Sequence, residues 1–148
     1  MNNKFNLTID AKLKNEGLIR DFIAAFLVPL DPTIDELSDI KTAISEVVTN
    51  CIVHGYDGRE DGSIYITCSI DGTNLTISVA DDGVGIKDIE KAKQPFFTTK
   101  PDAERSGMGF TIMETFMDSL DVQNRPEGGL IVTLSKNLNL NNQDGYQK

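Results

Sequence analysis

The sequence predicts an α/β (α+β) two-layer sandwich, in which helices cover one face of a mixed, mostly antiparallel sheet. Segments that alternate apolar and polar residues, as half-buried strands do, occur near the start, in the middle and towards the end of the chain. Two segments with helical periodicity separate the first strand from the others. The 148 residues contain no linker or internal repeat, so we expect one domain over 1–148, with 137–148 as a disordered tail.

The first third of the chain predicts a strand followed by two amphipathic helices. Residues 5–9 alternate apolar and polar side chains, which indicates a short strand. Apolar residues then recur at helical spacing over 15–29, where a proline ends the pattern. The next helix is expected to begin at Thr33, which forms a capping box with Glu36, and to run to about residue 54.

The rest of the chain predicts a hairpin, a long loop, a helix and two further strands. Residues 64–70 and 75–79 alternate and flank an Asp-Gly-Thr-Asn turn, which is typical of an antiparallel hairpin. Residues 86–107 have no sustained period, so we expect a functional or mobile loop. The last expected elements are a helix over 108–117 and strands over 120–123 and 130–134.

Charge and hydropathy exclude several classes of function. The chain has 14 basic and 23 acidic residues, a net charge of −9, which repels nucleic acid and anionic lipid. No apolar run is long enough to span a bilayer, and the first residues lack the apolar core of a signal peptide. We therefore expect a cytoplasmic protein with no direct nucleic-acid or membrane partner, whose Cys51 and Cys68 are free, buried thiols.

Three polar residues spaced by four form one column on the second predicted helix. Glu46, Asn50 and His54 share a face that borders the apolar arc of that helix. A carboxylate, an amide and an imidazole in this position can serve a site. The same column is also compatible with an ordinary polar flank, in which His54 caps the end of the helix.

A glycine-containing acidic segment follows the strand over 75–79. In the sequence Asp81-Asp82-Gly83-Val84-Gly85, the glycines let the backbone approach a ligand, and a carboxylate can accept a hydrogen bond from an amino group on a flat heterocycle. An ordinary acidic turn is the alternative reading. Either Asp81 or Asp82 could be the acceptor, and the spacing favours Asp81.

Glycines also open the third predicted helix. In Gly107-Met108-Gly109, unpaired backbone N–H groups and the positive end of the helix dipole would meet an anion such as phosphate. Lys100 and Arg105 precede these glycines in an otherwise acidic chain, which favours an anion over a plain flexible helix entry.

Taken together, these features resemble the GHKL family of ATP-binding domains, which have the Bergerat fold. Within that family, three segments are similar to the bacterial anti-sigma serine kinases, most of all to the sporulation anti-sigma-F type. The segments are SEVVTNCIVHGY, DDGVGI and QPFFTTKPDAERSGMGFTIMETFMD. The resemblance covers residues 5–136, nearly the whole chain.

The resemblance implies a role for each matching residue. It implies that Glu46 is a general base, that Asn50 ligates Mg²⁺, and that Asp81 recognises the adenine amino group, beside Gly83 and Gly85. It places Arg20 at a docking surface for protein partners. The residues that it places around the ATP phosphates, with Arg105 at the γ-phosphate, are Thr98, Thr99, Arg105, Ser106, Gly107, Met108 and Gly109.

The sequence departs from the family at one point. Leu130 and Ile131 follow Gly128-Gly129, where the family usually has threonine, so a hydroxyl contact near the adenine pocket is missing or is made by another group.

The implied function is that of an anti-sigma factor with ATP-dependent protein serine kinase activity. Such a homodimeric protein binds ATP and Mg²⁺, sequesters a sigma factor, here expected to be sigma F, and phosphorylates a serine of an anti-anti-sigma partner. The alternatives are a general-stress anti-sigma serine kinase and a nucleotide-dependent sigma-binding module without kinase activity. A histidine kinase is disfavoured because the only histidine, His54, lies in the same helical segment as Glu46 and Asn50, which is called the N-box in the family, and this leaves no phosphoacceptor helix. A gyrase-like or MutL-like ATPase is disfavoured because we expect no second domain that could couple to hydrolysis.

Overall fold

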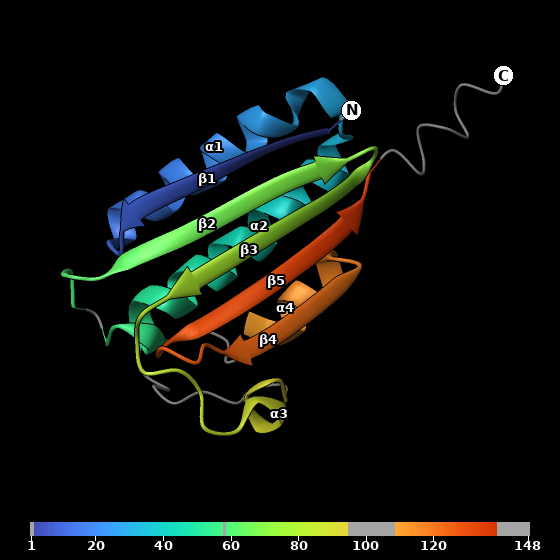
Figure 1. Ribbon diagram of the computed structural model, residues 1–148. Helices are drawn as coiled ribbons and strands as arrows, with labels where there is room; N and C mark the ends of the chain where they lie inside the picture. Colours follow the sequence, from blue (N-terminus) through green and yellow to red (C-terminus); the bar gives the residue numbers. More distant parts are fainter. Residues whose placement is uncertain (1, 58, 95–108, 139–148) are drawn as a thin grey trace, which may run out of the picture.

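A computed structural model describes residues 2–57, 59–94 and 109–138 of the chain. Its centre is a five-stranded sheet with the strand order β1-β2-β3-β5-β4 (Figure 1). The strands are β1 (Asn2–Asp10), β2 (Ser63–Asp71), β3 (Asn74–Asp81), β4 (Ser119–Asn124) and β5 (Leu130–Asn137).

Every strand pairing among the described residues is antiparallel, so the sheet has no parallel pair there, unlike the mixed sheet expected. The connection between β1 and β2 explains this. Two helices, α1 (Glu16–Leu27) and α2 (Ile34–Asn50), separate these strands. These helices run antiparallel to each other as a helical hairpin (Figure 1). A single crossover helix between β1 and β2 would leave the two strands parallel. The second helix reverses the chain once more, and the strands are therefore antiparallel.

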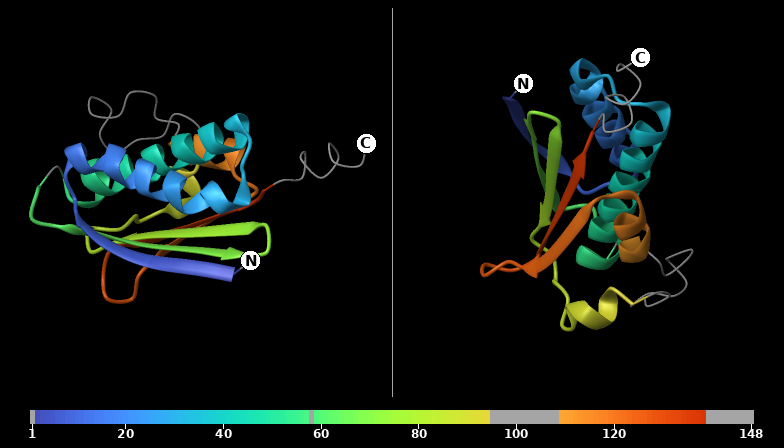
Figure 2. Two further views of the ribbon diagram at one scale, coloured as in Figure 1. Left: turned by 90° about the horizontal axis from the view of Figure 1, so that it is seen from above. Right: turned by 90° about the vertical axis from the view of Figure 1, so that its right-hand side faces the viewer.

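The helices form a single layer on one face of the sheet. Figure 2 shows α1, α2 and the short α4 (Gly109–Phe116) on the same side, as the sequence predicts. Helix α2 packs against both α1 and α4, and the inward-facing side chains of the strands meet this layer. The fully buried side chains of the core include Ile19, Ile23, Ile40, Ile44, Ile64, Ile66, Leu75, Ile77, Met113 and Leu134.

The two ends of α2 differ. At its start, Glu36 N–H donates to Thr33 Oγ1 at 3.0 Å and Thr33 N–H donates to Glu36 Oε1 at 2.8 Å, so the predicted capping box is confirmed. At its end, the helix continues as a π-helical turn over Cys51–Gly55. Such wide turns are frequent at functional sites. Here the turn exposes the Gly55 carbonyl, which accepts a hydrogen bond from Val84 N–H at 3.1 Å.

Local differences from the expected elements occur after β3 and at the end of the chain. Part of the segment predicted as a loop over 86–107 forms a short helix, α3 (Ile89–Ala92), because Asp88 Oδ1 caps it by accepting from Lys91 N–H at 3.0 Å. Strand β5 includes Asn137, and Leu138 is fully buried, so the expected tail at 137–148 begins later; residues 139–148 lie outside the described part.

Two further expectations concern membranes and thiols. No helix in the described ranges has the length and apolar character that crossing a membrane requires. Cys51 and Cys68 are both free and buried, as predicted. Burial raises the pKa of the Cys68 thiol to about 12, so this thiol stays protonated at neutral pH.

Candidate functional site

A cavity of about 680 Å³ lies where the end of α2 meets the ends of β3 and β5, α3 and the start of α4. Its volume falls within the usual range for small-molecule sites. The residues that line it are Val47, Asn50, Cys51, His54, Gly55, Asp57, Asp81, Val84, Gly85, Ile86, Lys87, Asp88, Lys91, Ala92, Gly109, Phe110, Leu130 and Val132.

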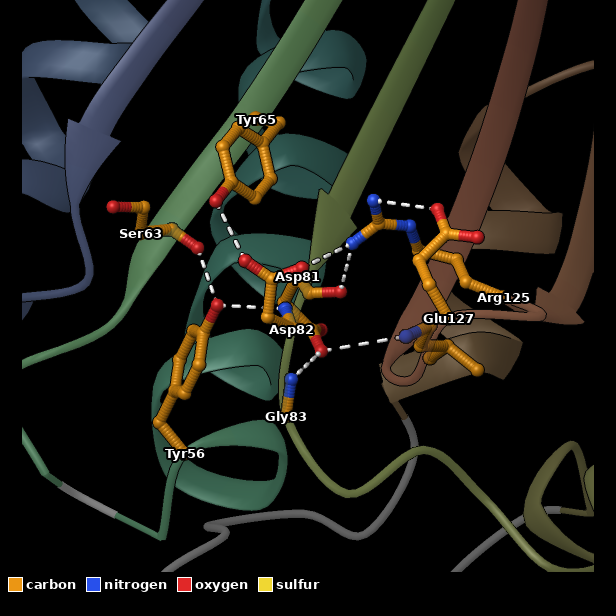
Figure 3. A network of polar contacts seen from close by, with 9 residues as sticks. Tyr56, Ser63, Tyr65, Asp81, Asp82, Gly83, Arg125 and Glu127 are labelled. Carbon is orange, nitrogen blue, oxygen red and sulfur yellow. Dashed lines mark hydrogen bonds and ion pairs between the residues drawn. The ribbon is translucent and has the colours of Figure 1, made fainter.

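Asp81 is the buried carboxylate of this cavity, with 2% of its surface exposed. It is the last residue of β3 and continues the inward-facing alternation of that strand. Its Oδ1 accepts hydrogen bonds from Gly83 N–H at 2.9 Å and Leu130 N–H at 3.3 Å (Figure 3). The Cys51 thiol also donates to this carboxylate. Burial raises the pKa of Asp81, and these donors oppose the increase.

Asp82 has the opposite surroundings. Its side chain is exposed, and it does not belong to the described cavity wall. Tyr65 O–H donates to its Oδ2 at 2.6 Å, and Arg125 Nη1 donates to its Oδ1 at 2.7 Å (Figure 3). These two contacts lower the pKa of Asp82. Of the two candidate carboxylates, the structure therefore places Asp81 in the cavity and commits Asp82 to a network outside it.

The two glycines after Asp81 allow close contacts. A Cβ atom at Gly83 would lie 2.1 Å from the carbonyl oxygen of Gly55, so a side chain there would force the loop away from the π-helical turn. Gly85 has a φ of +70°, a conformation that L side chains rarely adopt, and it lines the cavity. Gly83 thus makes its close approach to the backbone of Gly55, and Gly85 lies in the cavity wall, while the approach of both glycines to a ligand stays a prediction.

The polar column of α2 reaches two different surfaces. Asn50 and His54 line the cavity. Glu46, one turn earlier, lines a groove of about 490 Å³ between α1 and α2. Arg20 of α1 lines the same groove and forms an ion pair with Glu16 at 2.8 Å. Glu46 and Asn50 are thus neighbours on one helix, but they face separate spaces.

The predicted phosphate segment is described only at its last residue. Gly109 begins α4, is buried and lines the cavity, so the start of that helix faces the same space as Asp81 and Asn50. The other residues assigned to this segment lie outside the described part of the chain, as does Lys100. They are Thr98, Thr99, Arg105, Ser106, Gly107 and Met108.

Sequence reasoning missed several residues of the cavity wall. Cys51 directly follows Asn50, but its apolar surroundings suggest only a core residue. Lys87 and Lys91 line the cavity as well, and the available signal was a pair of cations four residues apart in an acidic chain. This pair brings positive charge to the wall of a cavity that also contains three carboxylates, Asp57, Asp81 and Asp88.

Leu130 takes the place of the threonine that the family usually has, and two parts of the residue contribute. Its backbone N–H donates to Asp81 Oδ1, a contact that does not depend on the side chain. Its buried side chain adds an apolar surface to the cavity wall. Ile131 pairs with Ala80 in the sheet and does not line the described wall.

The chain has close relatives among curated proteins. The family described as "Histidine kinase-like ATPase domain" has a sequence model that matches residues 9–136 of this chain. An anti-sigma F factor of Halalkalibacterium halodurans is 51% identical over 138 residues, 93% of this chain and 94% of the relative. One from Clostridium botulinum (strain Eklund 17B / Type B) is 52% identical over 138 residues, 93% and 96% of the two chains. One from Heyndrickxia coagulans is 51% identical over 144 residues, 96% and 97% of the two chains.

Solved structures share the fold. The RsbU and RsbW domains of Rv1364c from Mycobacterium tuberculosis match with a TM-score of 0.66 and 22% identity, over 92% of this chain and 32% of that one. The catalytic domain of the histidine kinase ThkA matches with a TM-score of 0.58 and 22% identity, over 93% and 96% of the two chains. The chain belongs to the family of histidine kinase-like (GHKL-type) ATPase domains and, within it, to the anti-sigma F factors.

Proposed function

We propose that this protein binds ATP and Mg²⁺ in the cavity, sequesters sigma F and transfers the γ-phosphoryl group of ATP to a serine of an anti-anti-sigma protein. One observation carries the proposal. In a chain about half identical to anti-sigma F factors over nearly its whole length, a buried carboxylate, the amide of Asn50 and the first residue of a helix line one cavity.

Asp81 is the proposed acceptor for the adenine amino group. Its Oδ1 receives two backbone N–H groups and Oδ2 receives neither of them, so Oδ2 is the proposed acceptor for a ligand, beside the thiol of Cys51. Gly83 and Gly85 keep the adjacent backbone free of side chains. An apolar wall that includes Val84 and Leu130 suits the faces of a flat base.

The phosphates are assigned to the opposite part of the cavity. The start of α4 at Gly109 and the charges of Lys87 and Lys91 favour an anionic group. By resemblance, Thr98, Thr99, Ser106, Gly107 and Met108 surround the phosphates and Arg105 meets the γ-phosphate.

Asn50 is the proposed ligand of Mg²⁺. Among the described residues, no cluster of three or more His, Cys, Asp or Glu side chains could hold a metal ion. This fits Mg²⁺, which keeps several waters and is bound mainly through nucleotide phosphates, with few protein ligands. The amide oxygen of Asn50, in the cavity wall, has the right chemistry for such a hard cation. When bound, Mg²⁺ neutralises phosphate charge.

Glu46 is the proposed general base and Arg20 a partner-binding residue. Because Glu46 lines the groove rather than the nucleotide cavity, a serine carried by a protein partner can approach it from the side of α1. Arg20, on the same groove, supplies a guanidinium group for an acidic group of a partner. The nucleotide and the protein substrate would then occupy neighbouring spaces.

Phosphate transfer from radiolabelled ATP to an anti-anti-sigma protein tests this function. We expect Glu46→Gln to bind ATP·Mg²⁺ and sigma F but to transfer phosphate about 10²- to 10⁴-fold more slowly, because the amide keeps the shape of the side chain and loses its basicity. Glu60→Gln, an exposed carboxylate outside both the groove and the cavity, is the matched control and should transfer normally.

Two outcomes would contradict the proposal. If Glu46→Gln transfers phosphate at the wild-type rate, Glu46 is not the general base and belongs only to the polar flank of α2. A wild-type protein that binds ATP and sigma F without phosphorylating the partner would instead be a nucleotide-dependent binding module.

A further inference from the structure

A polar network lies behind the cavity, at the end of the sheet where β3 gives way to the Asp81–Gly85 segment (Figure 3). Its side chains are Tyr56, Tyr65, Asp82, Arg125 and Glu127. The described part of the cavity wall includes none of them. Apart from Asp82, which was the second candidate for the adenine acceptor, none of these residues has a role in the motifs of the sequence.

The network holds one peptide group by both of its polar atoms. Arg125 Nη1 donates to the carbonyl oxygen of Asp81 at 2.7 Å. The N–H of Asp82, the other polar atom of the same peptide group, donates to the hydroxyl of Tyr56 at 2.7 Å. Tyr56 O–H in turn donates to the carbonyl oxygen of Ser63 at 2.5 Å. The peptide is thereby tied to β2 on one side and to the β4–β5 turn on the other.

Beyond the end of the sheet, side chains supply the hydrogen bonds to the backbone that a neighbouring strand supplies within the sheet. The pairing of β3 with β5 ends at Ala80 and Ile131, and the pairing with β2 ends at Asp81 and Ile64. The peptide after Asp81 therefore lies at the limit of the sheet. Hydrogen bonds from a guanidinium group are stronger than neutral ones, so Arg125 is well suited to fix the orientation of this peptide.

The rest of the network holds Arg125 itself. Asp82 Oδ1 accepts from Nη1 of Arg125 at 2.7 Å, Glu127 Oε1 accepts from Nη2 at 3.0 Å, and the guanidinium carbon lies 5.7 Å from the ring centroid of Tyr65. Tyr65 also donates to Asp82. These contacts restrict Arg125 to one position, which is what a positioning residue requires.

We infer that Arg125 and Tyr56 are positioning residues that determine the preference of the site for adenine, because they orient the peptide from which the Asp81 carboxylate projects. The inference rests on the proposed nucleotide binding. Adenine presents an amino donor to a carboxylate, whereas guanine presents a carbonyl oxygen in the same place, which a carboxylate repels. A misoriented Asp81 therefore weakens ATP binding but does not weaken GTP binding further.

The test measures the dissociation constants of ATP and GTP, each with Mg²⁺, for the full chain. Arg125→Ala should weaken ATP binding about 10- to 100-fold, with GTP affinity almost unchanged, so the ATP-to-GTP preference falls by the same factor. Arg125→Lys should keep part of the preference, because the ammonium group can still donate to the Asp81 carbonyl oxygen. It should not keep all of it, because one ammonium group cannot reproduce the forked contacts of a guanidinium group. Tyr56→Phe, which removes the acceptor for Asp82 N–H, should lower the preference in the same direction.

Lys4→Ala is the control, because it removes an exposed cation from β1 without touching this network, and it should leave the preference unchanged. A merely structural role for the network would lower the melting temperature or weaken both nucleotides equally. Should Arg125→Ala fail to fold, Arg125→Lys and Tyr56→Phe still decide the question. An unchanged ATP-to-GTP ratio in both would overturn the inference, whereas a wild-type protein that binds no ATP would overturn the proposed function instead.

Discussion

At the scale of single residues, the neighbouring carboxylates of Asp81 and Asp82 lie in different environments. Asp81 is buried, accepts hydrogen bonds from two backbone N–H groups and has a raised pKa, while Asp82 is paired with Tyr65 and Arg125 and has a lowered one. A buried carboxylate with a perturbed pKa in a cavity is a typical mark of a functional group. Its burial destabilises the fold, as is common where a residue serves binding.

Asp81→Asn should separate binding from stability. An amide presents a donor where adenine also has a donor, so we expect ATP affinity to fall at least about tenfold by calorimetry. A smaller decrease in ATP affinity would contradict the assignment of Asp81 as the acceptor for the adenine amino group.

The same variant should change how stability depends on pH. Because burial raises the pKa of Asp81 above 3.8, the folded state binds more protons than the unfolded state between these two pKa values. The free energy of unfolding of the wild type therefore falls as pH rises through that window, and Asp81→Asn lacks this fall. In thermal melts without nucleotide, the melting temperature of the variant relative to wild type should rise with pH; a constant difference would contradict the assigned burial penalty.

At the scale of elements, two irregular segments create the site. The π-helical turn after α2 presents the Gly55 carbonyl to the segment after β3. The β4–β5 turn presents Leu130 N–H and Arg125 to Asp81. The Gly55 carbonyl and the Leu130 N–H are available for these contacts because they lie at the limits of their elements, where backbone groups are not used within the element.

Gly83→Ala tests the contact between these segments. Its Cβ would meet the Gly55 carbonyl oxygen at 2.1 Å, so the loop must move and we expect ATP affinity to fall more than about tenfold. Gly72→Ala is the matched control. Gly72 has a φ of +64° but no atom within 4 Å of its would-be Cβ, so it should cost about 1 kcal/mol of stability in urea unfolding and leave ATP binding intact. Equal effects of the two variants on ATP binding would argue against a close contact at Gly83.

At the scale of the whole molecule, one layer of helices covers one face of the sheet and leaves apolar side chains on its surface. Leu18 and Phe22, one turn apart on α1, are 57% and 46% exposed. The ring of Phe22 packs edge-on against Phe5 of β1, with centroids 4.8 Å apart. A surface with exposed apolar residues of this kind is compatible with association between protein chains.

We expect the protein to be a homodimer, as its resemblance to anti-sigma factors implies. Sedimentation equilibrium should give a mass twice that of one chain at micromolar concentration, with dissociation on dilution. A monomer mass across the whole concentration range, with and without ATP, would contradict the expected dimer.

Much of the fold and part of the site could be predicted from the sequence. The strand and helix segments and the capping box at Thr33 follow from periodicity and local spacing. The resemblance to the GHKL family, and not periodicity, implied that Asn50 and Asp81 serve one site, and both line the cavity. Helix α3 was not predicted, because its short length gives almost no periodic signal. Cys51 and Lys87 were missed because their place in the cavity depends on elements distant in sequence.

The sequence by itself determined the five strands and the three longer helices, since capping, alternation and helical spacing depend on residues only a few positions apart. Only the tertiary structure decided that Asp81 and not Asp82 lies in the cavity wall, because Leu130 and Arg125, more than forty residues later, hold these carboxylates. It likewise decided that Glu46 lines a groove with Arg20 of α1, whereas Asn50 lines the cavity with Gly109 of α4. Contacts between distant segments are set by how the elements pack, and no local pattern encodes them.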